Sequence, residues 1–339
     1  MEKDNVIVTG GAGFIGSHLV DFLVEKGFKV KVIDNLSSGR IENIKKHIDN
    51  STIEFYNIDL SDYSYQDKLI ELVRGCKWVF HLAALADIVP SIQHPIKYHK
   101  SNVDGTVNIL EASRKNEIEK FVYIASSSCY GIPEEYPTKE TAPIKPEYPY
   151  ALTKYIGEIY VLHWHKIYGL PVVSLRLFNV YGPRARTRGA YGAVFGVFLT
   201  QKLHNKPFTV VGDGTQTRDF TFVTDIVKGI YQAAQSRVNG EIINLGSGGT
   251  YSINRLVELL GGDVVHIPKR PGEPDCTFAD ISKAKELLGY KPEVSFEKGV
   301  KIMLEHIDEM RDAPLWTPEK IEEATKDWFK YLSKADKHD

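Results

Sequence analysis

Cysteine is scarce in this sequence. Only three of the 339 residues are cysteines, and Cys76, Cys129 and Cys276 are widely spaced and odd in number. No two of them stand at the spacing of metal ligands, and this usage is typical of a protein that stays in a reducing compartment. We therefore expect a cytoplasmic protein without a metal site.

An excess of charge of either sign is also missing, as are long hydrophobic runs. The chain has 42 Lys and Arg residues against 44 Asp and Glu residues, which offers no electrostatic reason to expect a nucleic acid or an acidic membrane as partner. No apolar run approaches the length of a membrane span. The N-terminus runs directly into an apolar strand, so we expect no signal peptide.

Short apolar runs alternate with helical patterns over the first 180 residues. The apolar runs predict strands at 6–8, 29–33, 53–57, 78–82, 121–124 and 172–176. Between them, helical patterns stand out at 64–74, 98–116 and 150–168. Near-continuous apolar strands separated by helices predict an α/β fold with a doubly wound parallel sheet of the Rossmann type.

The texture of the sequence changes after about residue 180, where Gly and Pro become more frequent and the helices shorter, at 193–204, 251–260 and 296–311. We expect a dinucleotide-binding domain over 1–180, with later strands from about 210–245 joining its sheet. A smaller α/β substrate domain, interleaved with it, is expected over 181–315. The tail 316–339 predicts an amphipathic C-terminal helix packed on the body.

A glycine loop connects the first predicted strand to the first predicted helix. Gly11-x-Gly13-x-x-Gly16 stands in this context, where glycines allow the backbone to approach a pyrophosphate at a helix N-terminus. Asp34 follows eighteen residues after Gly16, at the end of the second strand, where its carboxylate can bind a ribose diol and would repel a 2′-phosphate. The loop and the acid together predict NAD as cofactor.

A Tyr and a Lys stand four residues apart at Tyr150 and Lys154, within the predicted helix over 150–168, and therefore share one face. A free Tyr has a pKa of about 10, but a neighbouring ammonium and a positive nicotinamide ring would both favour the phenolate. Tyr150 could then take a proton from a hydroxyl while hydride leaves the same carbon. Lys154 would bind the nicotinamide ribose, and Ser126, at the end of a strand, the reacting oxygen.

These motifs resemble those of the extended short-chain dehydrogenase/reductases that act on nucleotide sugars, and within them the UDP-hexose 4-epimerases most. The resemblance spans nearly the whole chain. It rests on the segments 9–16, Asp34-Asn35-Leu36, Asp59-Leu60, His81-Leu82-Ala83-Ala84, 102–106, Tyr150 to Lys154, 175–183, Arg218-Asp219-Phe220 and Arg270-Pro271-Gly272-Glu273.

The resemblance implies two sets of contacts. Cofactor contacts are implied for Gly10, Gly13, Phe14, Ile15, Gly16, Asp34, Asn35, Asp59, Leu60, Leu82, Ala83, Ala84, Asn102, Tyr150 and Lys154. Asn179 is expected at the substrate diphosphate. Arg218 and Arg270 are expected to pair with its phosphates, because a planar guanidinium suits bidentate recognition. The helices near 98–116 and 150–168 resemble those that form a four-helix bundle in family dimers, which implies a homodimer.

The residues beside Ser126 bear on the reaction. In 4,6-dehydratases of the family an Asp-Glu pair typically follows the catalytic Ser or Thr, whereas here the positions hold Ser127 and Ser128. A serine hydroxyl cannot replace a carboxylate as general base without its own activator. We therefore expect a 4-epimerase acting through a transient 4-keto sugar, with Ser127 and Ser128 in the substrate site. A 4,6-dehydratase that recruits its acid and base elsewhere, for instance Asp87, remains the runner-up.

Three further positions bear on the sugar. Where epimerases restricted to glucose and galactose carry a bulky Tyr beside the C2 substituent, this chain has Thr277, which predicts room for an N-acetylhexosamine. Arg184 belongs to a loop with Arg186 and Arg188, one of which could reach the carboxylate of a uronic acid. A UDP-uronate is therefore an alternative substrate, which we rank below a UDP-hexose or a UDP-N-acetylhexosamine. A non-catalytic, cofactor-sensing protein is a distant third class.

Overall fold

The computed structural model describes residues 4–185 and 192–333. A seven-stranded sheet forms its centre, with strand order β11-β6-β5-β4-β1-β2-β3 and every neighbouring pair parallel. The strands are β1 (Asn5–Thr9), β2 (Lys29–Ile33), β3 (Ile53–Tyr56), β4 (Cys76–His81), β5 (Lys120–Ser126), β6 (Val172–Leu177) and β11 (Glu241–Leu245). The prediction of a Rossmann-type parallel sheet is confirmed.

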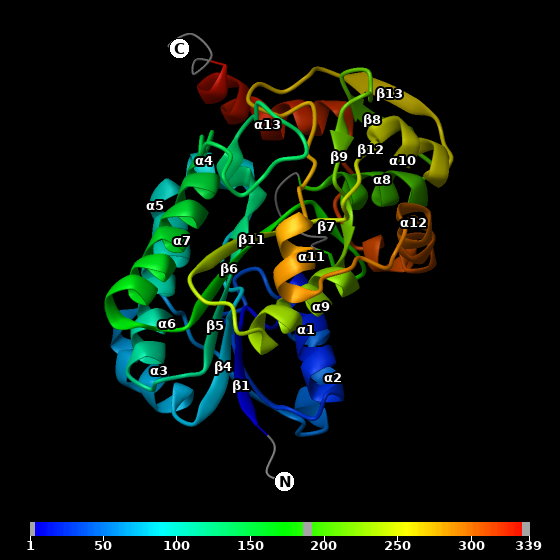
Figure 1. Ribbon diagram of the computed structural model, residues 1–339. Helices are drawn as coiled ribbons and strands as arrows, with labels where there is room; N and C mark the ends of the chain where they lie inside the picture. The colour runs from blue at the N-terminus through cyan, green and yellow to red at the C-terminus, as the bar shows by residue number, and fades with distance from the viewer. Residues whose placement is uncertain (1–3, 186–191, 334–339) are drawn as a thin grey trace.

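Helices cover both faces of this sheet (Figure 1). Because successive side chains of a strand point to opposite faces, Val6 and Val8 of β1 pack with one group of helices and Ile7 with the other. The first group is α1 (Phe14–Glu25), α9 (Val223–Gln235) and α11 (Ser282–Leu288). The second is α3 (Gln66–Val73), α6 (Gly105–Arg114) and α7 (Pro149–Tyr168). Burial on both faces explains the near-continuous apolar runs in the sequence.

The remaining strands form three two-stranded ladders outside the main sheet. They pair β7 (Val180–Tyr181) with β10 (Thr221–Phe222), β9 (Thr217–Arg218) with β12 (Tyr251–Ser252), and β8 (Phe208–Val211) with β13 (Val264–Ile267). Of the strands between 210 and 245, β11 joins the seven-stranded sheet, whereas β9 and β10 pair within these ladders.

A separate aromatic core holds this part of the chain together. Phe220 and Phe296 stack with centroids 5.2 Å apart, and Tyr181 stacks on Phe195 at 4.4 Å. The helices around it are α8 (Val194–Leu203), α10 (Ile253–Leu260) and α12 (Phe296–Glu305). Short helices elsewhere are α2 (Lys45–Asp49), α4 (Ile88–Gln93) and α5 (Pro95–His99), and α13 (Pro318–Leu332) lies near the end of the chain.

The helix predicted over 98–116 is not uniform. A π-helical segment, η3 (Lys100–Asp104), separates α5 from α6. It contains Asn102, whose amide nitrogen donates to Leu85 O at 3.0 Å and to Thr153 Oγ1 at 3.0 Å. Single π-helical turns of this kind are frequent at functional sites, and here the wide turn brings one amide side chain between α7 and the chain that follows β4.

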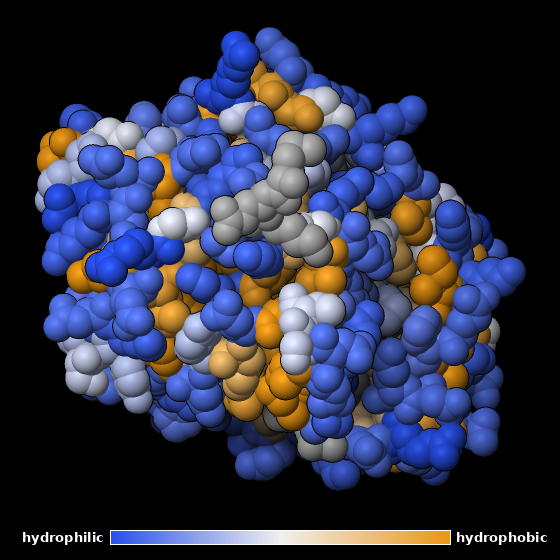
Figure 2. Space-filling model, turned by 90° about the horizontal axis from the view of Figure 1, so that it is seen from below, coloured by the Kyte–Doolittle hydropathy of each residue, from blue (hydrophilic) through white to orange (hydrophobic). Residues whose placement is uncertain are grey.

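The outer surface carries most of the charge. The face seen from below in Figure 2 is mainly hydrophilic, with hydrophobic residues exposed in small groups. Within residues 4–185 and 192–333, no helix combines the length and the apolar character needed to cross a membrane.

A buried ion pair connects α7 to β6. Glu158 and Arg176 are 1% and 2% exposed, and Arg176 Nε donates to Glu158 Oε2 at 3.1 Å. Ser174 Oγ donates to the same carboxylate oxygen at 2.7 Å, and the Arg176 guanidinium packs 4.8 Å from the Tyr130 ring centroid. Since both charges are buried, each depends on the other for compensation.

Replacing Glu158 by Gln should therefore lower the free energy of unfolding by about 3–5 kcal/mol, because Arg176 would keep its buried charge without a counter-charge. Urea denaturation followed by circular dichroism measures the change. The control is Glu293→Gln, which removes the exposed ion pair with Lys228 and should cost less than about 1 kcal/mol. Equal losses in the two variants would show that the buried pair has no special weight.

Candidate active site

A cavity of about 700 Å³ lies at the carboxyl ends of the central strands, the edge of an open parallel sheet where ligands bind. Residues that directly follow β1, β2, β4, β5 and β6 line it, and residues of α8 and β8 extend it toward the second core. All of the site residues predicted from the sequence line this cavity except Asn102 and Arg184.

The glycine loop forms one end of the cavity, and its shape leaves no room for side chains. Gly10 has a φ of +68°, and a Cβ there would lie 2.7 Å from the backbone nitrogen of Ala83. A Cβ on Gly16 would lie 2.1 Å from the carbonyl oxygen of Gly10. The loop therefore packs backbone against backbone and presents the N-terminus of α1 to the cavity, which fits a dinucleotide pyrophosphate.

Asp34 stands at the end of β2 and is held by backbone N–H groups. Its Oδ2 accepts from Ala12 N at 3.0 Å and its Oδ1 from Leu36 N at 2.8 Å. Burial raises the pKa of this carboxyl, and the two backbone donors oppose that rise. The carboxylate is thus fixed in orientation beside Asn35 at the cavity edge, as binding of a ribose diol requires.

Asn102 takes a different place from the one the resemblance implies. Its side chain is 1% exposed, and its Oδ1 accepts from Leu85 N at 2.8 Å. With its bonds to Leu85 O and Thr153 Oγ1, the amide braces the chain after β4 against α7. Leu85 follows Ala84, and Thr153 belongs to the helix of Tyr150 and Lys154, so the bonds of Asn102 connect two segments that border the cavity.

Tyr150 and Ser126 meet in the middle of the cavity. Burial raises the pKa of the Tyr150 phenol, a hydrogen bond with Ser126 partly opposes the rise, and the charge of Asp87 adds to it. Ser126 Oγ also lies 2.8 Å from Ser128 Oγ. The Tyr148 ring stacks on Tyr150 at 6.4 Å, so the phenol is held on two sides.

Lys154 follows Tyr150 by one turn of α7 and is itself buried. Its Nζ is 4.3 Å from the centroid of the Tyr123 ring, whose hydroxyl donates to Lys154 O at 2.9 Å. Burial lowers the pKa of the ammonium from 10.5 to about 7, although the Glu158 carboxylate opposes the fall. We expect the Lys154 ammonium to favour the Tyr150 phenolate. Burial opposes this effect, because it disfavours both the ammonium of Lys154 and the phenolate of Tyr150.

The far end of the cavity carries the two predicted phosphate ligands. Arg218 Nη2 lies 2.8 Å from Glu273 Oε1, and Arg270 Nη1 lies 3.6 Å from Glu273 Oε2. Asn179 and Thr277 are adjacent to them, and Thr277 Oγ1 donates to Asn179 Oδ1 at 2.6 Å. The two guanidiniums share the Glu273 carboxylate, and a second carboxylate, Glu147, lies beside Gly272 of the same loop.

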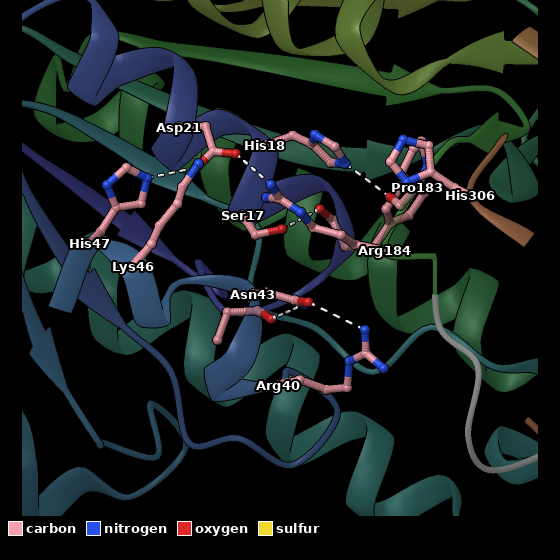
Figure 3. Close-up of polar contacts among 12 residues, drawn as sticks. Ser17, His18, Asp21, Arg40, Asn43, Lys46, His47, Pro183, Arg184 and His306 are labelled. Carbon is pink, nitrogen blue, oxygen red and sulfur yellow. Dashed lines mark hydrogen bonds and ion pairs between the residues drawn. The ribbon is translucent and has the colours of Figure 1, made fainter. Parts of the chain in front are cut away.

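The structure does not bring Arg184 to the cavity. Figure 3 shows its guanidinium turned toward α1, where Nη2 lies 2.7 Å from Asp21 Oδ2, and its backbone N donates to Glu309 Oε2 at 2.7 Å. Lys46 and His47 bind the same Asp21 carboxylate. Arg184 is thus committed to an ion pair between two parts of the fold, while Arg186 and Arg188 lie outside the described residues.

Sequence reasoning missed several residues that line the cavity, among them Glu147, Tyr148, Trp316 and Trp328. Tyr148 had a local signal, since it directly precedes Pro149 at the start of the helix that carries Tyr150. The two tryptophans had none, because the tail has the pattern of an ordinary amphipathic helix.

Comparison with known proteins gives consistent matches over most of the chain. The family model for GDP-mannose 4,6 dehydratase matches residues 7–303. The putative UDP-glucose 4-epimerase of Methanocaldococcus jannaschii is 38% identical over 303 residues, which cover 87% of this chain and 96% of that protein.

Solved structures agree in fold as well as in sequence. The UDP-N-acetylglucosamine 4-epimerase of Methanobrevibacter ruminantium, in complex with UDP-N-acetylmuramic acid, is 36% identical with a TM-score of 0.85, and covers 91% of this chain and 99% of that one. The UDP-glucuronic acid 4-epimerase of Bacillus cereus, in complex with UDP-glucuronic acid and NAD, is 34% identical with a TM-score of 0.83, at 90% and 99% coverage.

The burial of Lys154 predicts a pH-dependent stability. Its pKa is 10.5 when exposed and about 7 in the fold, so between these values the unfolded chain binds more protons at this site and stability rises with pH. In Lys154→Met this contribution to the rise should disappear, and the variant should unfold at higher urea concentration near pH 7. Urea unfolding at pH 7.5 and 9, without added nucleotide, measures both effects.

Lys120 also has a pKa lowered by burial, to about 8, but it is present in both proteins, so their difference reports Lys154. Lys45→Met, at an exposed position, is the matched control and should follow the wild-type pH dependence. If Lys154→Met gained stability with pH as steeply as the wild type does, the inferred cost of burying the ammonium would be wrong.

Proposed function

Because this chain belongs to the family of NAD-dependent nucleotide-sugar epimerases and dehydratases, we propose that it is a nucleotide-sugar 4-epimerase. Its substrate is proposed to be a UDP-hexose or a UDP-N-acetylhexosamine. The observation that carries the proposal is the cavity itself, in which Ser126, Ser127, Ser128 and Tyr150 line the wall between the glycine loop and the Arg218–Glu273–Arg270 cluster.

The proposed cofactor is NAD. Bound there, NAD supplies a hydride acceptor and then a hydride donor at sugar C4. The chain's part is to hold it: the Gly10–Gly16 loop lines the cavity with backbone rather than side chains, which suits a pyrophosphate, and the fixed Asp34 carboxylate suits a ribose diol. Lys154 lies deep in the same cavity, where its ammonium can donate to the second ribose.

Tyr150 is proposed as the proton acceptor and donor. It takes the proton of the C4 hydroxyl while hydride leaves C4, and a 4-keto sugar remains. It then returns that proton when hydride comes back to the other face of C4, so no net oxidation occurs. Ser126 donates to the reacting oxygen. Burial raises the pKa of Tyr150 and so disfavours its phenolate. The positive charge of Lys154 favours the phenolate, and a positive nicotinamide ring bound in the cavity would favour it further.

A 4,6-dehydratase is the second candidate, and one observation favours keeping it. Such an enzyme needs an acid and a base besides Tyr150. Ser127 and Ser128 stand where the family's dehydratases carry carboxylates, but Asp87 and Glu147 both line this cavity. Asp87 is near enough for its charge to raise the pKa of Tyr150, so a carboxylate does reach the reaction site from another segment.

A homodimer is proposed from the surface of α7. Leu152, Ile159, Tyr160 and Ile167 are 45%, 47%, 37% and 54% exposed. Burial of such a row against the same helix of a second copy would remove apolar area from water. We also propose a cytoplasmic location, which the three free cysteines support.

Incubation of the wild-type chain with a panel of UDP-, GDP-, CDP- and dTDP-sugars should give a product of unchanged mass from a UDP-sugar, detected by chromatography and mass spectrometry. Tyr150→Phe should slow this turnover by about 10²–10⁴-fold, the usual weight of a proton-transfer group, with an unchanged circular dichroism spectrum. A product lighter by one water would replace the epimerase with the dehydratase. Undiminished activity of Tyr150→Phe would overturn the assignment of the phenol.

The sugar specificity is tested at Thr277. Thr277→Tyr should reduce kcat/KM for UDP-N-acetylglucosamine relative to UDP-glucose by about tenfold or more, because a bulky ring beside C2 excludes an acetamido group. Thr277→Ser is the matched control, since it keeps the hydroxyl that binds Asn179. If both variants changed the two substrates equally, Thr277 would not border the C2 substituent.

A further inference from the structure

The chain after residue 312 forms part of the cavity wall. Ala313, Pro314, Trp316 and Trp328 line the same cavity as Tyr150, and Trp328 is only 4% exposed. Helix α13, which carries Trp328, lies at the top of Figure 1 and packs against α4. It begins at Pro318, outside the residues 7–303 that the family model matches.

Trp328 contacts the loop that holds one of the two cavity arginines. Its ring centroid is 5.4 Å from the Arg270 guanidinium carbon, and its indole N–H donates to Pro271 O at 2.8 Å. Leu332, one turn further along α13, closes over Gly272, where an added Cβ would lie 3.7 Å from it. Three consecutive loop residues are therefore held by one face of α13.

The orientation of Arg270 matters because it shares Glu273 with Arg218. Glu273 lies 2.8 Å from Arg218 and 3.6 Å from Arg270, so one carboxylate is shared by the two guanidiniums. A flat aromatic face beside the guanidinium restricts its plane and adds a cation–π attraction. Trp328 thus adds a restraint on the plane of the Arg270 guanidinium.

The same two residues of α13 also pack toward Tyr148, which lies next to Tyr150. Trp328 and Leu332 pack with Val89 of α4, and Tyr148 packs against this cluster. Gln93 Nε2 donates to Asp327 Oδ2 at 2.8 Å. Since Tyr148 also stacks on Tyr150, α13 connects the Arg270 loop to the residues that hold the phenol.

We propose that α13 is a component of the substrate site, in which Trp328 is a positioning residue that orients the Arg270 guanidinium toward a substrate diphosphate. The inference rests on the proposed function, because that function supplies the diphosphate. It adds a segment that sequence reasoning treated as a packing helix. The group that Arg270 would contact is the pyrophosphate, which UDP has and uridine lacks. Binding of UDP should therefore depend on Trp328, and binding of uridine should not.

The test is calorimetric titration of the full chain with UDP and with uridine. Trp328→Leu keeps apolar bulk against Val89 but removes the aromatic face and the N–H, and should weaken UDP binding about tenfold with uridine binding unchanged. Trp328→Phe keeps the ring and should restore most of the UDP affinity. In the double variant with Arg270→Ala, the loss of Trp328 should add little, because both changes remove the same contact.

Tyr331→Ala is the matched control, an aromatic residue of the same helix that is 50% exposed and outside the cavity lining; it should bind UDP as the wild type does. In steady-state kinetics Trp328→Leu should raise KM with little change in kcat. Unchanged UDP affinity of Trp328→Leu, or an equal loss for uridine, would overturn the inference while the proposed function stands. A wild-type chain that binds UDP in this Trp328-dependent way but converts no nucleotide sugar would refute only the function, and one that binds no UDP would refute both.

Discussion

The buried pair of Glu158 and Arg176 is the interaction on which the rest of the site depends. Tyr150, Lys154 and Glu158 follow one another at intervals of four residues along α7, so they share one face of the helix. The ion pair fixes the Glu158 turn of α7 to β6. One turn earlier, the hydroxyl of Tyr123 on β5 donates to the backbone oxygen of Lys154. With two turns fixed to the sheet, Tyr150 has a set position at the carboxyl ends of the strands.

The same arrangement sets the electrostatics of the catalytic end. An ammonium that is buried loses hydration, and its charged form becomes costly. Glu158 partly offsets that cost for Lys154, but its own charge is engaged by Arg176. As a result, Lys154 has a pKa of about 7, and Tyr150, one helical turn before it, has a raised pKa. Such a pair responds strongly to any charge that enters the cavity, which is a property suited to a site where protons move in both directions.

The fold was predictable because its signals are local. Apolar runs, a glycine loop and Asp34 each report on the few residues around them, and the parallel order then follows from the alternation of strands and helices. The resemblance to a family predicted site residues that, except for Asn102 and Arg184, do line the cavity, although many other lining residues were not predicted. The roles of Arg184 and Trp328 were not predictable, because they depend on partners far away in sequence, Asp21 on α1 for the first and Arg270 for the second. A composition of charged and aromatic residues cannot reveal which of them will find such partners.

The distribution of charge along the cavity bears on the choice of sugar. Among the described residues that line it, the cations are Lys154, Arg218 and Arg270. Arg218 and Arg270 stand together with Glu273, and Glu147 lies beside Gly272 of the same loop, whereas Asp87 is the carboxylate whose charge acts on Tyr150. A sugar carboxylate placed near Tyr150 would face the like charge of Asp87 in a partly desolvated setting, where repulsion is stronger than in water. Arg184 does not relieve it, since its charge is bound to Asp21. This distribution of charge supports the proposed hexose with an uncharged ring over a uronate.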